Sequence, residues 1–213
     1  MIQPKKRLVF RRLAAAAALL ALSGCAAISA LGDASRPLDV YELRPPEAIA
    51  PVRRAVPRDV IVELPTTSGA LSTDRIMIRP DPLQAQYLPD VRWSEPTPVM
   101  VQTLMLRTIE ATQAVRYVGR RPLGPGGDYA IVTEVVDFQA ELGADGDSAE
   151  VRLRIIVRLV READARIVAS RTFVAEALSP STETRSVIEA FDVASERLLA
   201  DFAEWIPGVL GAR

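Results

Sequence analysis

The chain contains no histidine, and both cysteine and lysine are nearly missing from its 213 residues. Its one cysteine is Cys25, and its two lysines, Lys5 and Lys6, lie at the very start. Beyond Cys25 these gaps exclude Ser-His-Asp and Cys-His centres, Ser-Lys dyads and Schiff bases. Zinc would lack its usual ligands, and one cysteine cannot form a disulfide within the chain. What remains is carboxylate chemistry, either paired-acid hydrolysis or a metal with oxygen ligands.

The first 24 residues follow the plan of a secretory signal peptide. Five basic residues within positions 5–12 precede an apolar run from Leu13 to Leu22, and the small residues Ser23 and Gly24 follow it. The run is too short to span a hydrocarbon core of about 30 Å, which needs roughly 20 residues. We therefore predict that residues 1–24 are a signal peptide that is removed.

The residues Leu22-Ser-Gly-Cys25 resemble the lipobox of bacterial lipoproteins, whose cysteine receives a diacylglycerol and becomes the acylated first residue. Residues 25–37 would then be a lipidated N-terminus and a short tether. Two residues beyond the cysteine stands Ala27 and not Asp, which by resemblance to Gram-negative lipoproteins implies lipid anchoring at the periplasmic face of the outer membrane. The alternatives are an ordinary signal peptide before an incidental cysteine, or a cytosolic protein with an apolar start.

The charge of the remaining chain is negative. Removal of residues 1–24 leaves 21 basic against 27 acidic residues. A negative exported domain binds nucleic acid poorly, so we expect no nucleic-acid partner. The length of this part suits one domain with a proper core.

Short apolar segments between proline-rich loops predict strands in the first half of the domain. We expect these strands at residues 38–43, 60–64, 75–79 and 84–88, with a loop rich in proline at 44–58. Thr97 followed by Pro98 is typical of a helix start, with a capping hydroxyl and then proline at the first helical position. Apolar spacing continues this helix to about Gln113, and a strand at 115–118 follows.

The sequence of the second half of the domain predicts three long strands and a long helix. Residues 129–142, 150–160 and 166–177 should form an antiparallel meander, because turn residues separate them and the middle segment alternates apolar and polar residues. Residues 182–206 carry one apolar stripe, and Pro207-Gly208 should end that helix. The expected fold is a single α/β domain. Its mixed, largely antiparallel sheet of six or seven strands packs against two main helices.

The candidate partner-binding surface is a row of arginines on the predicted middle strand, namely Arg152, Arg154 and Arg158. This row could meet lipid phosphates or an acidic partner. The alternative interpretation is a solvated sheet face, partly paired across strands with acids such as Glu134 or Glu176.

Two groups of carboxylates have partial features of a metal site or of an acid catalyst. Asp145-Gly-Asp147 with Glu150 is faintly similar to a calcium loop, but it is too short and lies between two strands, which favours a hairpin turn. Glu95 beside Trp93 could be an acid with a raised pKa. A structural role is favoured, with Trp93 in the core and Glu95 near the positive helix start. We expect no catalytic residue, no metal and no cofactor.

Several motifs together resemble the ABC-type transport auxiliary lipoprotein family, across residues 38–206. Trp93-Ser-Glu95-Pro96 at the first helix is the most specific of them, and Thr97 departs from the leucine that the family favours there. The others are the lipobox, Tyr41-Glu-Leu43, Asp74-Arg-Ile76, Tyr129–Phe138, Arg171-Thr-Phe173, and Ala190, Ala194-Ser195 and Leu198 in the last helix.

This resemblance implies a non-catalytic lipoprotein of an envelope lipid transport system with an MCE (mammalian cell entry) protein and an ABC transporter as partners. The domain would span residues 38–206, with 207–213 as a C-terminal tail. The lipid carried, the docking surface and the oligomeric state stay open, a homo-oligomer included. The alternatives are a lipoprotein regulator of a peptidoglycan synthase and a carboxylate-dependent hydrolase.

Overall fold

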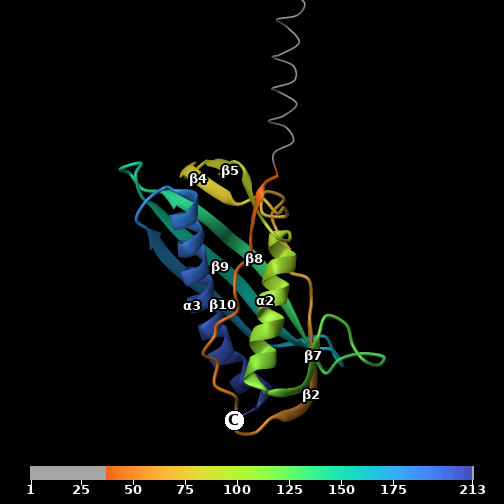
Figure 1. Cartoon of the computed structure of the whole chain (residues 1–213). Helices are drawn as coiled ribbons and strands as arrows, with labels where there is room; N and C mark the ends of the chain where they lie inside the picture. Colours follow the sequence, from red (N-terminus) through yellow and green to blue (C-terminus); the bar gives the residue numbers. More distant parts are fainter. Residues whose placement is uncertain (1–36, 213) are drawn as a thin grey trace, which may run out of the picture. The chain divides into compact units, whose positions relative to one another are not determined.

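A long antiparallel meander forms the centre of the fold (Figure 1). It consists of β8 (Tyr129–Leu142), β9 (Ala149–Arg161) and β10 (Arg166–Ser179). Along β9, buried apolar residues alternate with charged residues that reach solvent, so the sheet has one apolar and one wet face. The predicted meander is confirmed, to within two residues at each end.

The computed structural model describes residues 37–212. The predicted signal peptide, Cys25 and almost all of the tether therefore lie outside the described residues. Across the described residues, no helix combines the length and apolar character needed to cross a membrane.

The remaining strands add mainly parallel pairings to the meander. Strand β8 pairs in parallel with β2 (Val56–Val62), β3 (Thr66–Thr67) and β4 (Met77–Asp81), which occupy successive stretches of its edge. Strand β7 (Val115–Gly119) lies parallel to β2, and β5 (Gln84–Tyr87) lies antiparallel to β4. The result is a mixed eight-stranded sheet, beside a two-stranded sheet of β1 (Asp39–Tyr41) and β6 (Val91–Trp93).

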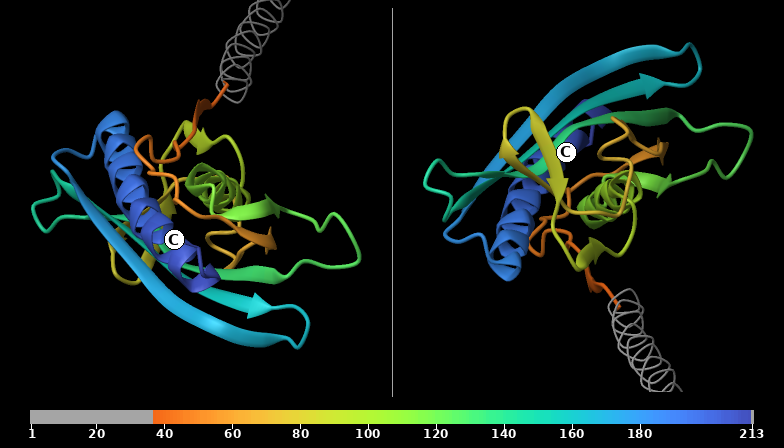
Figure 2. Two further views of the ribbon diagram at one scale, coloured as in Figure 1. Left: turned by 90° about the horizontal axis from the view of Figure 1, so that it is seen from below. Right: turned by 90° about the horizontal axis from the view of Figure 1, so that it is seen from above.

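Two helices pack on the inner side of the curved sheet, α2 (Thr97–Thr112) and α3 (Thr184–Leu210) (Figure 2). An aromatic cluster lies in the core between helices and sheet, where Trp93, Phe138 and Phe191 contact one another. This confirms the mixed α/β fold with two main helices, and the sheet has more strands than the six or seven expected.

Three predictions at proline residues were wrong. The N-cap of α2 is Pro96 and makes no side-chain cap, while the hydroxyl of Thr97 donates to the carbonyl of Thr73 at 3.3 Å. Strand β4 does not stop before Pro80 but includes it, at an irregularity in the β4–β5 register where a missing N–H is tolerated. Helix α3 also continues through Pro207.

The end of α3 explains why Pro207 is accepted. Pro207 lies in the last turn, where it removes a single intrahelical hydrogen bond, and both Pro207 and Leu210 are buried. Gly211 then adopts φ 85° and ends the helix, and the N–H of Ala212 donates to the Pro207 carbonyl at 2.9 Å. Residues 207–210, expected in a C-terminal tail, are therefore the last turn of the helix.

A bulge in β8 decides which side chains reach each face. The register between β8 and β9 shifts between Val135 and Asp137. Val135 and Phe138 are both buried, which strict alternation would not allow. The N–H of Phe138 donates to Oε1 of Gln139 at 2.9 Å. The bulge thus turns Phe138 into the core and leaves Asp137 on the outer face.

Candidate functional site

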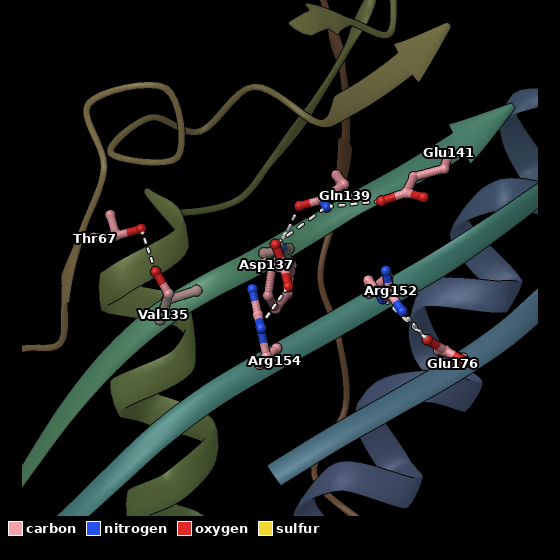
Figure 3. Close-up of polar contacts among 9 residues, drawn as sticks. Thr67, Val135, Asp137, Gln139, Glu141, Arg152, Arg154 and Glu176 are labelled. Atoms are coloured by element: carbon pink, nitrogen blue, oxygen red, sulfur yellow. Dashed lines mark hydrogen bonds and ion pairs between the residues drawn. The ribbon is translucent and has the colours of Figure 1, made fainter. Parts of the chain in front are cut away.

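The predicted arginine row lies on the outer face of the meander, and each of its arginines faces an acid on a neighbouring strand. Figure 3 shows two of these pairs, those of Arg152 and Arg154. Arg152 Nη2 lies 2.8 Å from Glu176 Oε1 on β10. The other two arginines pair with β8: Arg154 Nε lies 2.6 Å from Asp137 Oδ2, and Arg158 Nη2 lies 3.7 Å from Glu134 Oε2.

These contacts confirm the interpretation of the row as a paired, solvated sheet face with Glu134 and Glu176. Asp137 was not predicted as a partner, because only the bulge places it opposite Arg154. The hydrogen bond that the Arg152 guanidinium donates to Glu176 raises the pKa of Arg152, so this guanidinium stays charged. Since the pairs are partly exposed, each contributes about 0–1 kcal/mol, and the row is a charge-balanced surface and not a free cationic patch.

The outer face becomes acidic toward the β8–β9 turn. Gln139 Nε2 donates to Asp137 Oδ1 at 3.4 Å and to Glu141 Oε1 at 3.1 Å (Figure 3). In the next register positions Glu141 stands directly opposite Glu150. Like charges directly opposite each other destabilise a strand pair, and no ion pair of the described residues neutralises either acid.

The carboxylates with shifted pKa values do not resemble general acids. The pKa of Asp128 is lowered, first by the hydrogen bond from the Asp59 N–H and then by Arg58. The pKa of Asp164 is lowered by its hydrogen bond from Arg161. A general acid at neutral pH needs the opposite shift, toward higher values. These groups hold loops together as anions.

The candidate calcium loop is a hairpin turn, as favoured. Asp145 accepts the N–H groups of Asp147 and Ser148, both at 3.1 Å, which lowers its pKa, and Gly146 has φ 74°. Within residues 37–212 there is no group of three His, Cys, Asp or Glu side chains that could hold a metal ion.

Trp93 and Glu95 both have structural roles. Trp93 is buried in the core, as predicted, 5.3 Å between ring centroids from Phe191. Glu95 Oε2 accepts a hydrogen bond from the hydroxyl of Thr103 on α2 at 3.4 Å. Arg120 donates to the same hydroxyl at 2.6 Å, which links the motif to the end of β7.

The proline-rich segment is attached to both helices. Arg44 pairs with Asp192 of α3, and the N–H of Val52 donates to the last carbonyl of α2, that of Thr112, at 2.9 Å. A groove of about 610 Å³ lies between residues 48–53 and the C-terminal half of α3. The segment, predicted as a proline-rich loop over 44–58, is therefore a strap over the helices, and its last residues from Val56 belong to β2.

A second groove of about 470 Å³ follows the margin of the sheet between β10 and α3. The sequence does not predict this groove, because its position depends on which strand ends the sheet. Leu178 of β10 is 69% exposed there, and Val193 of α3 is 40% exposed. Both are apolar side chains in contact with solvent, beside Glu150 of β9, which also lines the groove.

Comparison with known proteins gives the family. The model of the ABC-type transport auxiliary lipoprotein component matches residues 41–203. The chain belongs to this family. An uncharacterised protein of Bradyrhizobium diazoefficiens is 23% identical over 168 residues, which make up 78% of this chain and 44% of that protein. The chain thus spans less than half the length of this relative.

Two solved structures share the fold of this auxiliary lipoprotein. A protein of Xanthomonas campestris has a TM-score of 0.72 at 23% identity, over 81% of this chain and 96% of its own. A second, uncharacterised protein has a TM-score of 0.62 at 15% identity, over 80% of this chain and 99% of its own. The shared architecture agrees with the mixed sheet and two helices described above.

Proposed function

We propose that this chain is a non-catalytic lipoprotein of an ABC transporter system of the MCE class, anchored in the outer membrane, where it docks a periplasmic MCE protein. The observation that carries the proposal is the family match over residues 41–203. Its family name assigns an auxiliary role in ABC-type transport and a lipoprotein nature. Outer-membrane anchoring and the MCE partner are our extensions of it.

The surface chemistry supports docking over catalysis. The arginines of the outer face are committed to ion pairs, and the shifted carboxylates are held as anions. Histidine is absent from the whole sequence. A protein interface needs exposed apolar area within a polar rim, and the groove beside β10 offers Leu178 and Val193 in such a setting.

The proposed anchor is the acylated Cys25. One acyl chain holds a protein to a membrane only marginally, whereas several chains hold it firmly. About a dozen residues separate Cys25 from β1, and a fully extended segment of that length reaches at most about 40 Å. The domain would therefore stay near the membrane surface, which suits a receptor for a partner that crosses the periplasm.

The test is genetic. Deletion of the gene should raise outer-membrane permeability and change the distribution of lipids between the two membranes. Wild-type protein should restore both properties, whereas a Cys25→Ser variant at equal abundance should not. An unchanged permeability and lipid distribution in the deletion strain would contradict the proposal.

A further inference from the structure

Strand β10 ends the sheet and offers a long unpaired edge. Within the described chain it pairs with β9 alone, over the 14 residues Arg166–Ser179. Figure 2 shows it along the margin of the sheet, with α3 on its inner side. An exposed strand edge presents free N–H and C=O groups that another extended chain can pair with.

The side chains beside this edge are unusually apolar for a solvent-exposed strand. Val174 and Leu178 are 48% and 69% exposed, and they point to the same face because they lie four residues apart in one strand. On the other side of the edge, Val193 of α3 closes the groove of about 470 Å³. A strand added here would cover apolar groups on both of its faces.

The charged residues around the groove indicate which charge a bound partner segment should carry. Glu150 lines the groove, and in register it stands between Glu141 of β8 and Leu178 of β10. Glu176 and Glu189, which also line the groove, already pair with Arg152 and Arg185. Arg197 also lines the groove, where its guanidinium donates to the Glu176 carbonyl and forms no ion pair with a described carboxylate. Glu141 and Glu150 likewise have no ion pair, so an arginine or lysine of an incoming strand, placed opposite Leu178, would approach Glu150 from one strand away.

We propose that the partner protein docks by adding an extended segment to the free edge of β10, with apolar residues over Val174 and Leu178 and a basic residue toward Glu150. This inference rests on the proposed function for the identity of the partner, the MCE protein. Main-chain hydrogen bonds would provide the affinity of such strand addition, and the pockets and charges beside the edge its specificity.

One contact at the free edge of β10 agrees with strand addition. Arg197 of α3 donates from Nη1 to the carbonyl of Glu176 on β10 at 2.8 Å. Charged side chains on edge strands are a common protection against unwanted pairing. Arg197 is exposed, so its guanidinium can leave this carbonyl for solvent when a partner segment pairs with the edge. The edge is thus protected at one position and open on either side of it.

The experiment uses photo-crosslinking amino acids in the full-length, acylated lipoprotein in its own cells. Positions Val174 and Leu178 report on the edge of β10, Ile156 reports on the outer face of β9, and Leu123, which is 75% exposed, is the control on the β7–β8 loop. We expect adducts with the MCE protein at 174 and 178, several times above the yield at 123. Both should map to one short segment that contains arginine or lysine.

Charge reversal at Glu150 tests whether its carboxylate contributes to binding of the partner. Glu150→Arg should lower the MCE adduct yield on the order of tenfold, because it puts a repelling charge one strand away from the basic residue of the docked segment, across Leu178. Glu110→Arg, on the exposed side of α2, is the matched control and should leave the yield unchanged. Equal yields in Glu150→Arg and wild-type protein would overturn the charge argument and with it the assigned segment.

The other outcomes separate this inference from the proposed function. MCE adducts at Ile156 or Leu123 with none at β10 would overturn strand addition and leave the function standing. An adduct with a second copy of this chain at Val174, in place of the MCE protein, would make the edge a self-interface and overturn the proposal. MCE adducts at no position would contradict the proposed function itself.

Discussion

Truncation of Phe191 to alanine tests the arrangement of the core most sharply. The side chain is fully buried on α3, with its ring centroid 5.3 Å from that of Trp93 and 5.6 Å from that of Phe138. It therefore joins the helix to the sheet and to the segment before α2. Replacing a buried Phe by Ala costs about 3–5 kcal/mol, out of a typical total of about 5–15 kcal/mol.

Urea unfolding of the purified mature protein, followed by tryptophan fluorescence, measures this cost. With a denaturant dependence of about 2 kcal/mol per molar, the midpoint should fall by about 1.5–2.5 M. Phe191→Leu, which keeps most of the apolar volume, should show a smaller loss. Val193→Ala on the exposed side of the same helix should stay within about 0.5 kcal/mol of wild type. An unchanged midpoint in Phe191→Ala would refute the assignment of the buried face of α3.

Three further predictions concern the anchor and the charged groups. Cys25→Ser should abolish acylation and release a soluble periplasmic form, and mass spectrometry of the membrane fraction should find no unmodified Cys25 in wild type. The pKa of Asp128 is lower in the folded protein than its ordinary value of 3.8, so its contribution is present at neutral pH and is lost as the pH falls below about 3.8. Asp128→Asn should thus lower the free energy of unfolding at pH 7, and this effect should shrink as the pH falls below 3.8. A double-mutant cycle between Arg154 and Asp137 should give a coupling of about 1 kcal/mol or less, and a coupling of several kcal/mol would contradict a solvated pair.

The elements whose sequences have a strong apolar periodicity could be predicted from the sequence. Strand β9 alternates apolar and charged residues over 13 positions, and the apolar stripe of α3 repeats at helical spacing. Burial of Ile188, Phe191 and Phe202 against the meander follows from these patterns and is confirmed. The pairing of Arg152 with Glu176 could also be predicted, because both lie on neighbouring strands of the predicted meander.

The rest depends on contacts between distant segments. Strand β3 has only two residues, and the hydroxyl of Thr67 supports its pairing with β8 by donating to the Val135 carbonyl at 2.8 Å. The bulge before Asp137 has no glycine to mark it, so the Arg154 partner was missed. Pro207 followed by Gly208 favours a helix end in the sequence, but burial of the last turn outweighs one lost hydrogen bond. Which strand ends the sheet, and therefore the groove beside β10, likewise follows only from the topology.

The central claim is that this auxiliary lipoprotein docks an MCE protein and performs no chemistry. Its most direct test is isolation of the tagged, acylated protein from gently solubilised envelopes, with quantitative mass spectrometry of what accompanies it. The account predicts stoichiometric recovery of an MCE protein, together with the permease and ATPase of its transporter. Recovery of a peptidoglycan synthase with no MCE protein would contradict the account.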